Sequence, residues 1–175
     1  MSEDDEEMVV TPWEVRGKID YDRLIREFGT QRIDDNLKQR IYRLAGEDNI
    51  YLRRDLFFSH RDLIWLLDEY EKGNKFIIYT GRGPSGPVHI GHLVPWMFTK
   101  WMQEKFDTRL YFQITNDEKF FFEDDLSYED VHRFTFENSL DLLALGFEPD
   151  KTFIIDDIKN IDLLYPLGVQ VAKKV

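Results

Sequence analysis

The spacing of apolar residues predicts a helix in the first third of the chain. Its apolar positions are Leu37, Ile41 and Leu44, which fall on one face at 3.6 residues per turn. Asp34 or Asp35 can cap its amino end, and Gly46 stands where such a helix would end. The pattern therefore predicts a capped helix that buries one side.

A second helix is predicted before residue 75. Its apolar positions are Leu63, Ile64, Leu67 and Tyr70. Ser59 and Asp62 have the spacing of a capping box, in which the first side chain accepts a backbone N–H of the helix. Gly73 follows and can adopt the left-handed conformation that ends helices. Residues 11–74 are therefore expected to form a mainly helical segment.

From residue 75 onwards, short apolar runs alternate with helical patterns. The runs at 76–79, 110–114 and 152–155 have the length and composition of β-strands. The first is so apolar that we expect it to be covered on both faces. Alternating strands and helices are typical of a parallel sheet with right-handed crossovers. The expected fold class is α/β, a Rossmann-like parallel sheet preceded by an N-terminal helical segment.

The helices between these strands carry their own signals. The first is expected to bear Trp96, Met97, Trp101 and Met102 and to run towards Phe106. Pro95 fits this helix only in the first turn, because proline has no backbone N–H. Ser127 and Asp130 resemble a capping box for the second helix, which should end at Gly146. We assign the aromatic side chains of this region to core or interface packing, namely Trp96, Trp101, Phe120, Phe121, Phe122 and Phe134.

Charge and composition argue against several classes of protein. The formal net charge of −11 argues against a simple nucleic-acid-binding module, whose surface is usually basic. The acidic start MSEDDEE is unlike a signal peptide, and no apolar run approaches the roughly 18 residues of a membrane span. The chain has no cysteine, which excludes disulfides and thiolate metal sites. We expect a cytoplasmic protein without a membrane partner, in which residues 1–10 form a solvated acidic tail.

One loop carries the candidate chemistry. Residues 79–92, between the first strand and the following helix, read YTGRGPSGPVHIGH. Doubly wound sheets bind ligands at this point, where the helix dipole and free N–H groups favour anions. The loop's glycines would let a ligand lie close to the backbone. His89 and His92 begin the helix, where their N–H groups could meet phosphate oxygens, and Gly91 between them would leave room for a flat base.

Short patterns in this loop also allow other interpretations. Gly81, Gly83 and Gly86 match a dinucleotide-binding fingerprint, but the loop's two prolines keep it extended where that fingerprint needs a helix. His89 and His92 could bind a metal or could be plain surface histidines. A third metal ligand is not evident, because the other histidines are distant in sequence and cysteine is absent. We therefore expect no protein-ligated metal.

Residues 89–92 spell HIGH, the signature of class I aminoacyl-tRNA synthetases. The longer string YTGRGPS at 79–85 resembles tryptophanyl-tRNA synthetases of the archaeal and eukaryotic branch. The resemblance extends to IDYDRLI at 19–25, LRRDLFFSHRD at 52–62, FTKW at 98–101, QITNDEK at 113–119 and GF at 146–147. It therefore covers nearly the whole chain after the acidic tail, and it implies that residues 75–175 are the first half of a HIGH-class nucleotide-binding catalytic domain.

The resemblance implies a two-step reaction in which tryptophan is activated with ATP and then transferred to tRNA(Trp). The residues implied for ATP, with Mg²⁺ as its counter-ion, are Arg82, Gly83, His89, Gly91 and His92. His89, His92 and Lys119 are implied as the catalytic groups that stabilise phosphate charge. Arg82 and Lys119 could instead be surface residues.

The residues implied for tryptophan are Tyr79, Gly81, Gln113 and Glu118. Tyr79 and Gln113 can meet the indole N–H, and an ionised Glu118 can accept the α-ammonium. Tyr79 could also belong to the core, and Glu118 could simply complement a helix dipole. Gln113 is the most informative of these, because an amide within an apolar strand is costly to bury without a partner.

The chain contains neither the family's second, lysine-rich signature loop nor its anticodon-reading domain. We therefore expect a fragment that binds ATP and tryptophan weakly and charges tRNA poorly or not at all. The resemblance also implies a homodimer. A tyrosyl-tRNA synthetase and a non-catalytic nucleotide-binding or interaction fragment stay open as alternatives.

Overall fold

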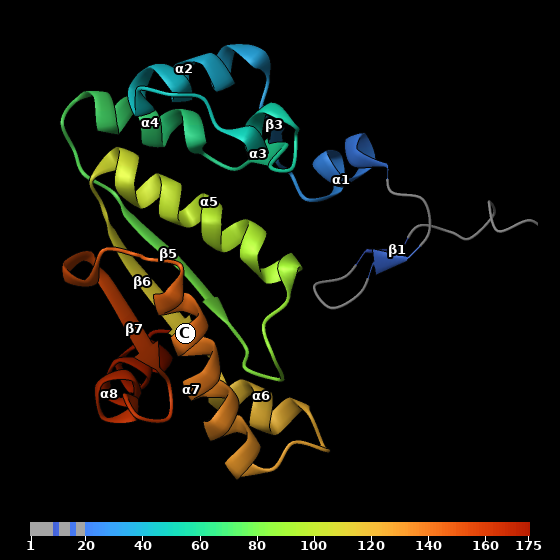
Figure 1. Ribbon diagram of the computed structural model, residues 1–175, viewed down its shortest axis with the longest axis vertical. Helices are drawn as coiled ribbons and strands as arrows, with labels where there is room; N and C mark the ends of the chain where they lie inside the picture. The colour runs from blue at the N-terminus through green and yellow to red at the C-terminus, as the bar shows by residue number, and fades with distance from the viewer. Residues whose placement is uncertain (1–8, 11–14, 17–19) are drawn as a thin grey trace, which may run out of the picture. The chain divides into compact units, whose positions relative to one another are not determined.

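The structure is a computed structural model that describes residues 9–10, 15–16 and 20–175 (Figure 1). The chain forms two compact units, residues 1–69 and 70–175. The boundary falls inside one helix, α4 (Leu63–Glu71). Residues 1–8 of the expected acidic tail lie outside the described residues. The assignment of domains to residues 11–74 and 75–175 stays a prediction.

The first unit consists of short helices and two small antiparallel strand pairs. Its strands are β1 (Val9–Val10) paired with β2 (Val15–Arg16), and β3 (Gln31–Arg32) paired with β4 (Ser59–His60). Its helices before α4 are α1 (Tyr21–Glu27), α2 (Asp35–Ala45) and α3 (Ile50–Arg53). In the described part of this unit, helices account for more residues than strands do.

Capping explains where α2 begins and why the prediction for α4 was partly wrong. The Asp34 carboxylate accepts the Leu37 N–H at 2.8 Å, and Gly46 ends α2 with φ 78°, as predicted. Ser59 does not cap α4, because it lies in β4. Instead the His60 ring accepts the Leu63 N–H at 3.2 Å. Imidazole nitrogen can replace the expected hydroxyl oxygen as the cap acceptor.

The second unit is built on a parallel sheet of three strands. In chain order it contains β5 (Ile77–Arg82), α5 (Ile90–Phe106), β6 (Arg109–Ile114), α6 (Asn116–Phe122), α7 (Tyr128–Ala144), the 3₁₀ turn η2 (Pro149–Lys151), β7 (Thr152–Asp156) and α8 (Ile161–Ala172). The strands lie side by side in the order β5–β6–β7, all parallel (Figure 1). The predicted strands, the α/β class and the Rossmann-like sheet are confirmed.

One face of this sheet carries the core of the second unit. Trp96 from α5 and Leu142 from α7 pack with Leu110, Phe112 and Ile114 from β6, and all five are buried. The opposite face is open along β5, where Ile77 is 61% and Tyr79 is 65% exposed. The expectation that this strand is covered on both faces was therefore wrong for the described chain. Its burial alternates with the period of two that belongs to a half-covered strand.

Several details differ from the sequence-based expectations. α5 begins at Ile90, so Pro95 lies beyond the first turn and leaves the Gly91 carbonyl without its usual helical donor. α8 was not predicted, and α6 was anticipated only by the alternative that Glu118 lies at a helix start. Trp96 and Trp101 are buried as expected, whereas Phe121 is 81% exposed and is not core. No helix among the described residues is long and apolar enough to cross a membrane.

Candidate nucleotide and amino-acid site

The register of the sheet brings the predicted site residues to one edge. Arg82, Ile114 and Asp156 are aligned at the carboxyl ends of β5, β6 and β7. The Thr115 N–H then donates to the Arg82 carbonyl at 3.1 Å, and the Asp157 N–H donates to the Ile114 carbonyl at 3.2 Å. Segments far apart in sequence therefore leave the sheet together, at the edge where such folds bind ligands.

The loop after β5 is held by Arg82. Its guanidinium donates through Nη2 to the carbonyls of Gly86 at 3.1 Å and Pro87 at 3.3 Å. Its Nε donates to the side-chain oxygen of Asn138 on α7. Burial lowers the pKa of Arg82, and the charge of Asp141 acts in the opposite direction. Nε and Nη2 of Arg82 are therefore used to hold the loop and α7 together. The N–H groups of Nη1 take no part in these three hydrogen bonds.

The two histidines of the loop make a capping arrangement at the start of α5. His89 is the N-cap residue, and its Nδ1 accepts the Gly91 N–H at 3.2 Å. The Nδ1 of His92 accepts the His89 N–H at 3.1 Å, and the ring centroids are 3.7 Å apart. Because both Nδ1 atoms accept, each neutral ring must carry its proton on Nε2.

The electrostatic surroundings of His92 favour that neutral form. Burial lowers the pKa of His92, and the charges of Arg82 and His89 lower it further. His92 is half-buried, whereas His89 is exposed. Each ring can thus offer an Nε2–H donor while its other nitrogen is fixed by the backbone.

At three glycine positions of the loop, neighbouring atoms lie so close that a side chain would meet them. A Cβ on Gly81 would collide with the Gln113 carbonyl of β6, and one on Gly83 would collide with the Lys119 side chain. A Cβ on Gly91 would lie 3.0 Å from the His89 ring. Gly91 therefore makes room for this ring, whereas the sequence suggested room for a base. Gly83 lets Lys119 reach the loop.

Two of the residues predicted for the amino acid, Tyr79 and Gln113, form a hydrogen-bonded row with Asp157. The Tyr79 hydroxyl donates to the Gln113 side-chain oxygen. The Gln113 amide nitrogen in turn donates to both carboxylate oxygens of Asp157, at 2.8 and 2.7 Å. Glu118 lies near the start of α6 with an exposed side chain. The described contacts bring together Tyr79, Gly81 and Gln113 but do not join Glu118 to them.

Asp157 was missed by sequence reasoning. Burial raises its pKa, the hydrogen bond from Gln113 lowers it, and the nearby carboxyls of Asp117 and Asp156 raise it. The available signal was the pair of acids directly after β7, at the edge of the sheet where ligands bind.

A buried asparagine fixes the start of α6 and was also missed. The Asn116 amide nitrogen donates to Asp156 at 2.8 Å and to Thr135 at 3.3 Å, and its oxygen accepts the Ile158 N–H at 3.0 Å. Asn116 is fully buried, so these bonds satisfy an amide that would otherwise be costly to bury. The network fixes the start of α6, one turn before Lys119.

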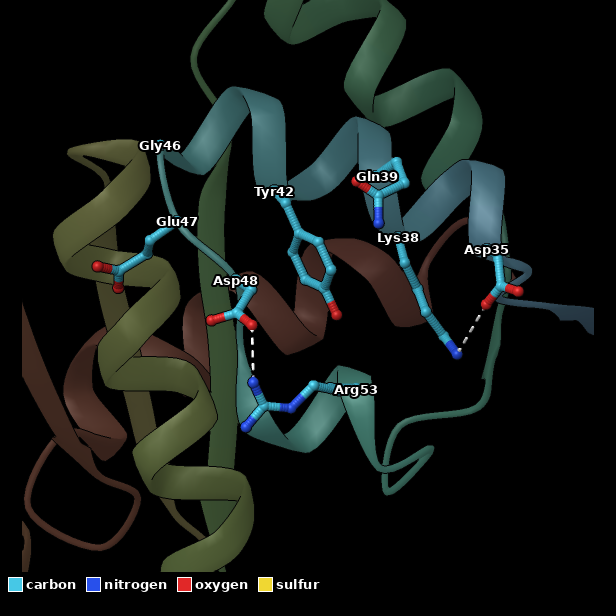
Figure 2. Close-up of a pocket in the computed structure, with 8 residues that line it drawn as sticks. All are labelled: Asp35, Lys38, Gln39, Tyr42, Gly46, Glu47, Asp48 and Arg53. Carbon is cyan, nitrogen blue, oxygen red and sulfur yellow. Dashed lines mark hydrogen bonds and ion pairs between the residues drawn. The ribbon is translucent and has the colours of Figure 1, made fainter.

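A separate cavity of about 440 Å³ lies in the first unit, beside α2 and α3 (Figure 2). Its cations are already paired: Lys38 lies 2.7 Å from Asp55, and Arg53 lies 2.8 Å from Asp48. The Tyr42 hydroxyl is buried among these groups and has no hydrogen-bond partner among the described residues. The lining carries more acidic than basic side chains, so this cavity does not favour an anion.

The described part of the chain contains no preformed metal-binding site. No group of three or more His, Asp or Glu side chains there could hold a metal ion. The His89 and His92 pair lacks a third protein ligand among the described residues, and both Nδ1 atoms already accept backbone N–H groups.

Comparison with known proteins identifies the family. The family model described as tRNA synthetases class I (W and Y) matches residues 71–162, more than half of the chain. The chain belongs to the class I tRNA synthetases. The match covers the sheet from β5 to β7 and the helices α5, α6 and α7 between its strands. It therefore includes every candidate site residue.

Relatives of this synthetase family resemble the chain over nearly its whole length. A tryptophan–tRNA ligase of Saccharolobus solfataricus is 52% identical over 170 residues, which are 97% of this chain and 45% of that protein. One from Pyrococcus furiosus is 52% identical over 98% of this chain and 44% of its own length. The crystal structure of Plasmodium falciparum tryptophanyl-tRNA synthetase is 42% identical, with a TM-score of 0.84 over 90% of this chain and 44% of that one. The chain thus spans a little under half the length of these relatives.

Proposed function

We propose that the protein containing this chain is a tryptophan–tRNA ligase, and that the chain carries its ATP and tryptophan sites. The observation that carries the proposal is the similarity to curated tryptophan–tRNA ligases, 52% identical across 97% of this chain. The arrangement of the loop after β5 supports it, because donors for phosphate lie at the carboxyl edge of a parallel sheet.

In the first step, a carboxylate oxygen of tryptophan attacks the α-phosphorus of ATP and pyrophosphate leaves. In the second, a hydroxyl of the terminal tRNA ribose attacks the tryptophanyl carbonyl and AMP leaves. The protein's work is to align the reactants and to stabilise charge on the phosphates.

His89 and His92 would donate their Nε2–H groups to ATP phosphates, because both Nδ1 atoms accept backbone N–H groups. Lys119 would add a positive charge beside Gly83, against which its side chain lies. Arg82 would reach a phosphate through Nη1, while its other donors hold the loop. Mg²⁺ would accompany ATP as a counter-ion held by the phosphates.

Tyr79, Gly81 and Gln113 would receive the indole. In the row from Tyr79 to Asp157, the Gln113 oxygen faces Tyr79 and the Tyr79 hydroxyl donates. The row therefore offers oxygen lone pairs to a ligand, which suits the donor-only indole N–H. Glu118 would accept the α-ammonium. tRNA(Trp), a homodimeric assembly and a cytoplasmic location complete the proposal.

The test is ATP–pyrophosphate exchange by the full-length protein with each amino acid in turn. We expect exchange with tryptophan and very little with tyrosine. Exchange with tyrosine alone would replace the proposal by a tyrosyl-tRNA synthetase. Absence of exchange with either amino acid would support a binding or interaction protein instead.

A further inference from the structure

The candidate ATP loop is joined to α7 by a side chain to which the family resemblance assigns no role. Asn138 on α7 is 1% exposed, and both polar atoms of its amide are used. Its oxygen accepts the Arg82 Nε–H, and its nitrogen donates to the Gly86 carbonyl at 3.1 Å. Asn138 therefore contacts the residue that ends β5 and the backbone four residues later.

These contacts close a three-membered ring of hydrogen bonds. The Gly86 carbonyl accepts from Arg82 Nη2 at 3.1 Å and from Asn138 at 3.1 Å, which uses both of its lone pairs. The Ser85 N–H donates to the Gly83 carbonyl at 3.0 Å, and Pro84 is fully buried. The chain between β5 and His89 is thus fixed on both sides.

We propose that Asn138 is a positioning residue that presets the loop before His89 for ATP, acting through Arg82 and the Gly86 carbonyl. The inference rests on the proposed function for its consequence but not for its geometry. Without Asn138, Arg82 Nε would lose its acceptor and the Gly86 carbonyl would lose one of two donors. The loop would then sample more conformations, and part of the binding energy of ATP would be spent on ordering it.

Gln103 provides a matched control. It is a fully buried amide on α5, and its hydrogen bonds lie at the opposite edge of the sheet. Its nitrogen donates to Thr152 at 2.9 Å, and its oxygen accepts the Glu148 N–H at 3.1 Å. Asn138→Ala and Gln103→Ala therefore remove equivalent groups, but only the first removes contacts to the loop.

The first measurement is hydrogen–deuterium exchange of residues 83–92, which does not depend on activity. We expect faster exchange in Asn138→Ala and unchanged exchange in Gln103→Ala. Equal exchange of this segment in wild type and Asn138→Ala would overturn the inference even if the protein is an active ligase.

The second measurement is the KM for ATP and for tryptophan in pyrophosphate exchange by the full-length protein. We expect Asn138→Ala to raise the KM for ATP about tenfold with little change for tryptophan, and Gln103→Ala to change neither. In an Arg82→Lys background the same substitution should have a smaller effect, because part of its action passes through Arg82 and coupled residues are not additive. Additive effects, or equal effects of the Gln103 variant, would overturn the positioning role, whereas a wild type without exchange would count against the proposed function alone.

Discussion

Asp107 combines an unusual backbone conformation with two ion pairs. It caps α5 at φ 48° and ψ 51°, in the left-handed region. Its carboxylate lies 2.5 Å from Lys151 and 3.0 Å from Lys75. These lysines precede β7 and β5, so a single aspartate joins the segments that enter the sheet at its amino edge. Hydrogen bonds and charge from the two lysines lower its pKa to about 2.

We predict that Asp107→Asn loses a pH-dependent part of the stability. Asparagine tolerates the left-handed conformation, so the substitution removes mainly the charge. The folded pKa of about 2 lies below the unfolded value near 3.8. The contribution is therefore complete above about pH 4 and is lost as the pH falls towards 2.

Thermal melts of both proteins from neutral to acid pH would test this prediction. The Tm difference between wild type and Asp107→Asn should be constant near neutrality, shrink below about pH 4 and decrease with added salt. Asp150→Asn, which changes the same formal charge near Lys151, should show no such loss. A Tm difference independent of pH would contradict the prediction.

The end of β5 depends on a glycine. Gly81 pairs with Gln113 in the parallel ladder, and an added Cβ would collide with the Gln113 carbonyl. The carbonyl belongs to backbone, so the collision cannot be relieved by a side-chain rotation. Close contact between β5 and β6 therefore requires glycine at the edge of the candidate site.

We predict that Gly81→Ala destabilises the protein by about 1–3 kcal/mol, as overpacking does in well-packed regions. Gly86→Ala is the control, because an added Cβ there meets nothing within 4 Å and its φ is not positive. It should change the free energy of unfolding by less than about 0.5 kcal/mol. Urea denaturation would measure both, and equal stability of the two variants would show that β5 can shift without cost.

Local sequence signals were enough to predict those helices whose ends are set by neighbouring residues. Asp34 and Ser127 cap α2 and α7, and Gly46 and Gly146 have the positive φ expected of helix ends. The start of α4 was misplaced because its cap acceptor is the His60 ring, which is not a common cap signal. α6 spans 7 residues, too few for a clear helical period, so only the alternative for Glu118 anticipated a helix start there.

The candidate site was predictable as a list of residues but only partly as a set of contacts. The HIGH sequence located the histidines, and strand order brought Tyr79 beside Gln113. The bond from Arg82 to Asn138 spans 56 positions, and the bonds from Gln113 to Asp157 span 44. No local periodicity encodes such pairs, so the hydrogen bonds by which Arg82 holds its own loop were not predicted, and its contact with a phosphate stays a prediction.

Helix α8 is apolar, but its apolar side chains are exposed. It has no buried residue, and its exposed apolar side chains are Ile161, Leu163, Tyr165, Leu167, Val169 and Val171. Leu163, Leu167 and Val171 are spaced four apart, so they form a stripe along one side of the helix. Apolar surface of this extent usually marks an interface or causes association.

We predict that the polypeptide of residues 1–175 self-associates in solution through this stripe. Burying Leu163, Leu167 and Val171 against a second copy would remove apolar surface from water at about 25 cal/mol per Å². Sedimentation velocity over a range of concentrations should show a weight-average mass above the 21.0 kDa of one chain. Leu167→Glu should restore the monomer, because it places a charge in the middle of the stripe. Val169→Glu adds the same charge on the opposite side of the helix, at another exposed apolar position, and should not. A monomeric wild type at high concentration would contradict the prediction. Association with equal effects of the two glutamate substitutions would show that α8 is not the contact and would favour the open face of β5, where Ile77 and Tyr79 are also exposed.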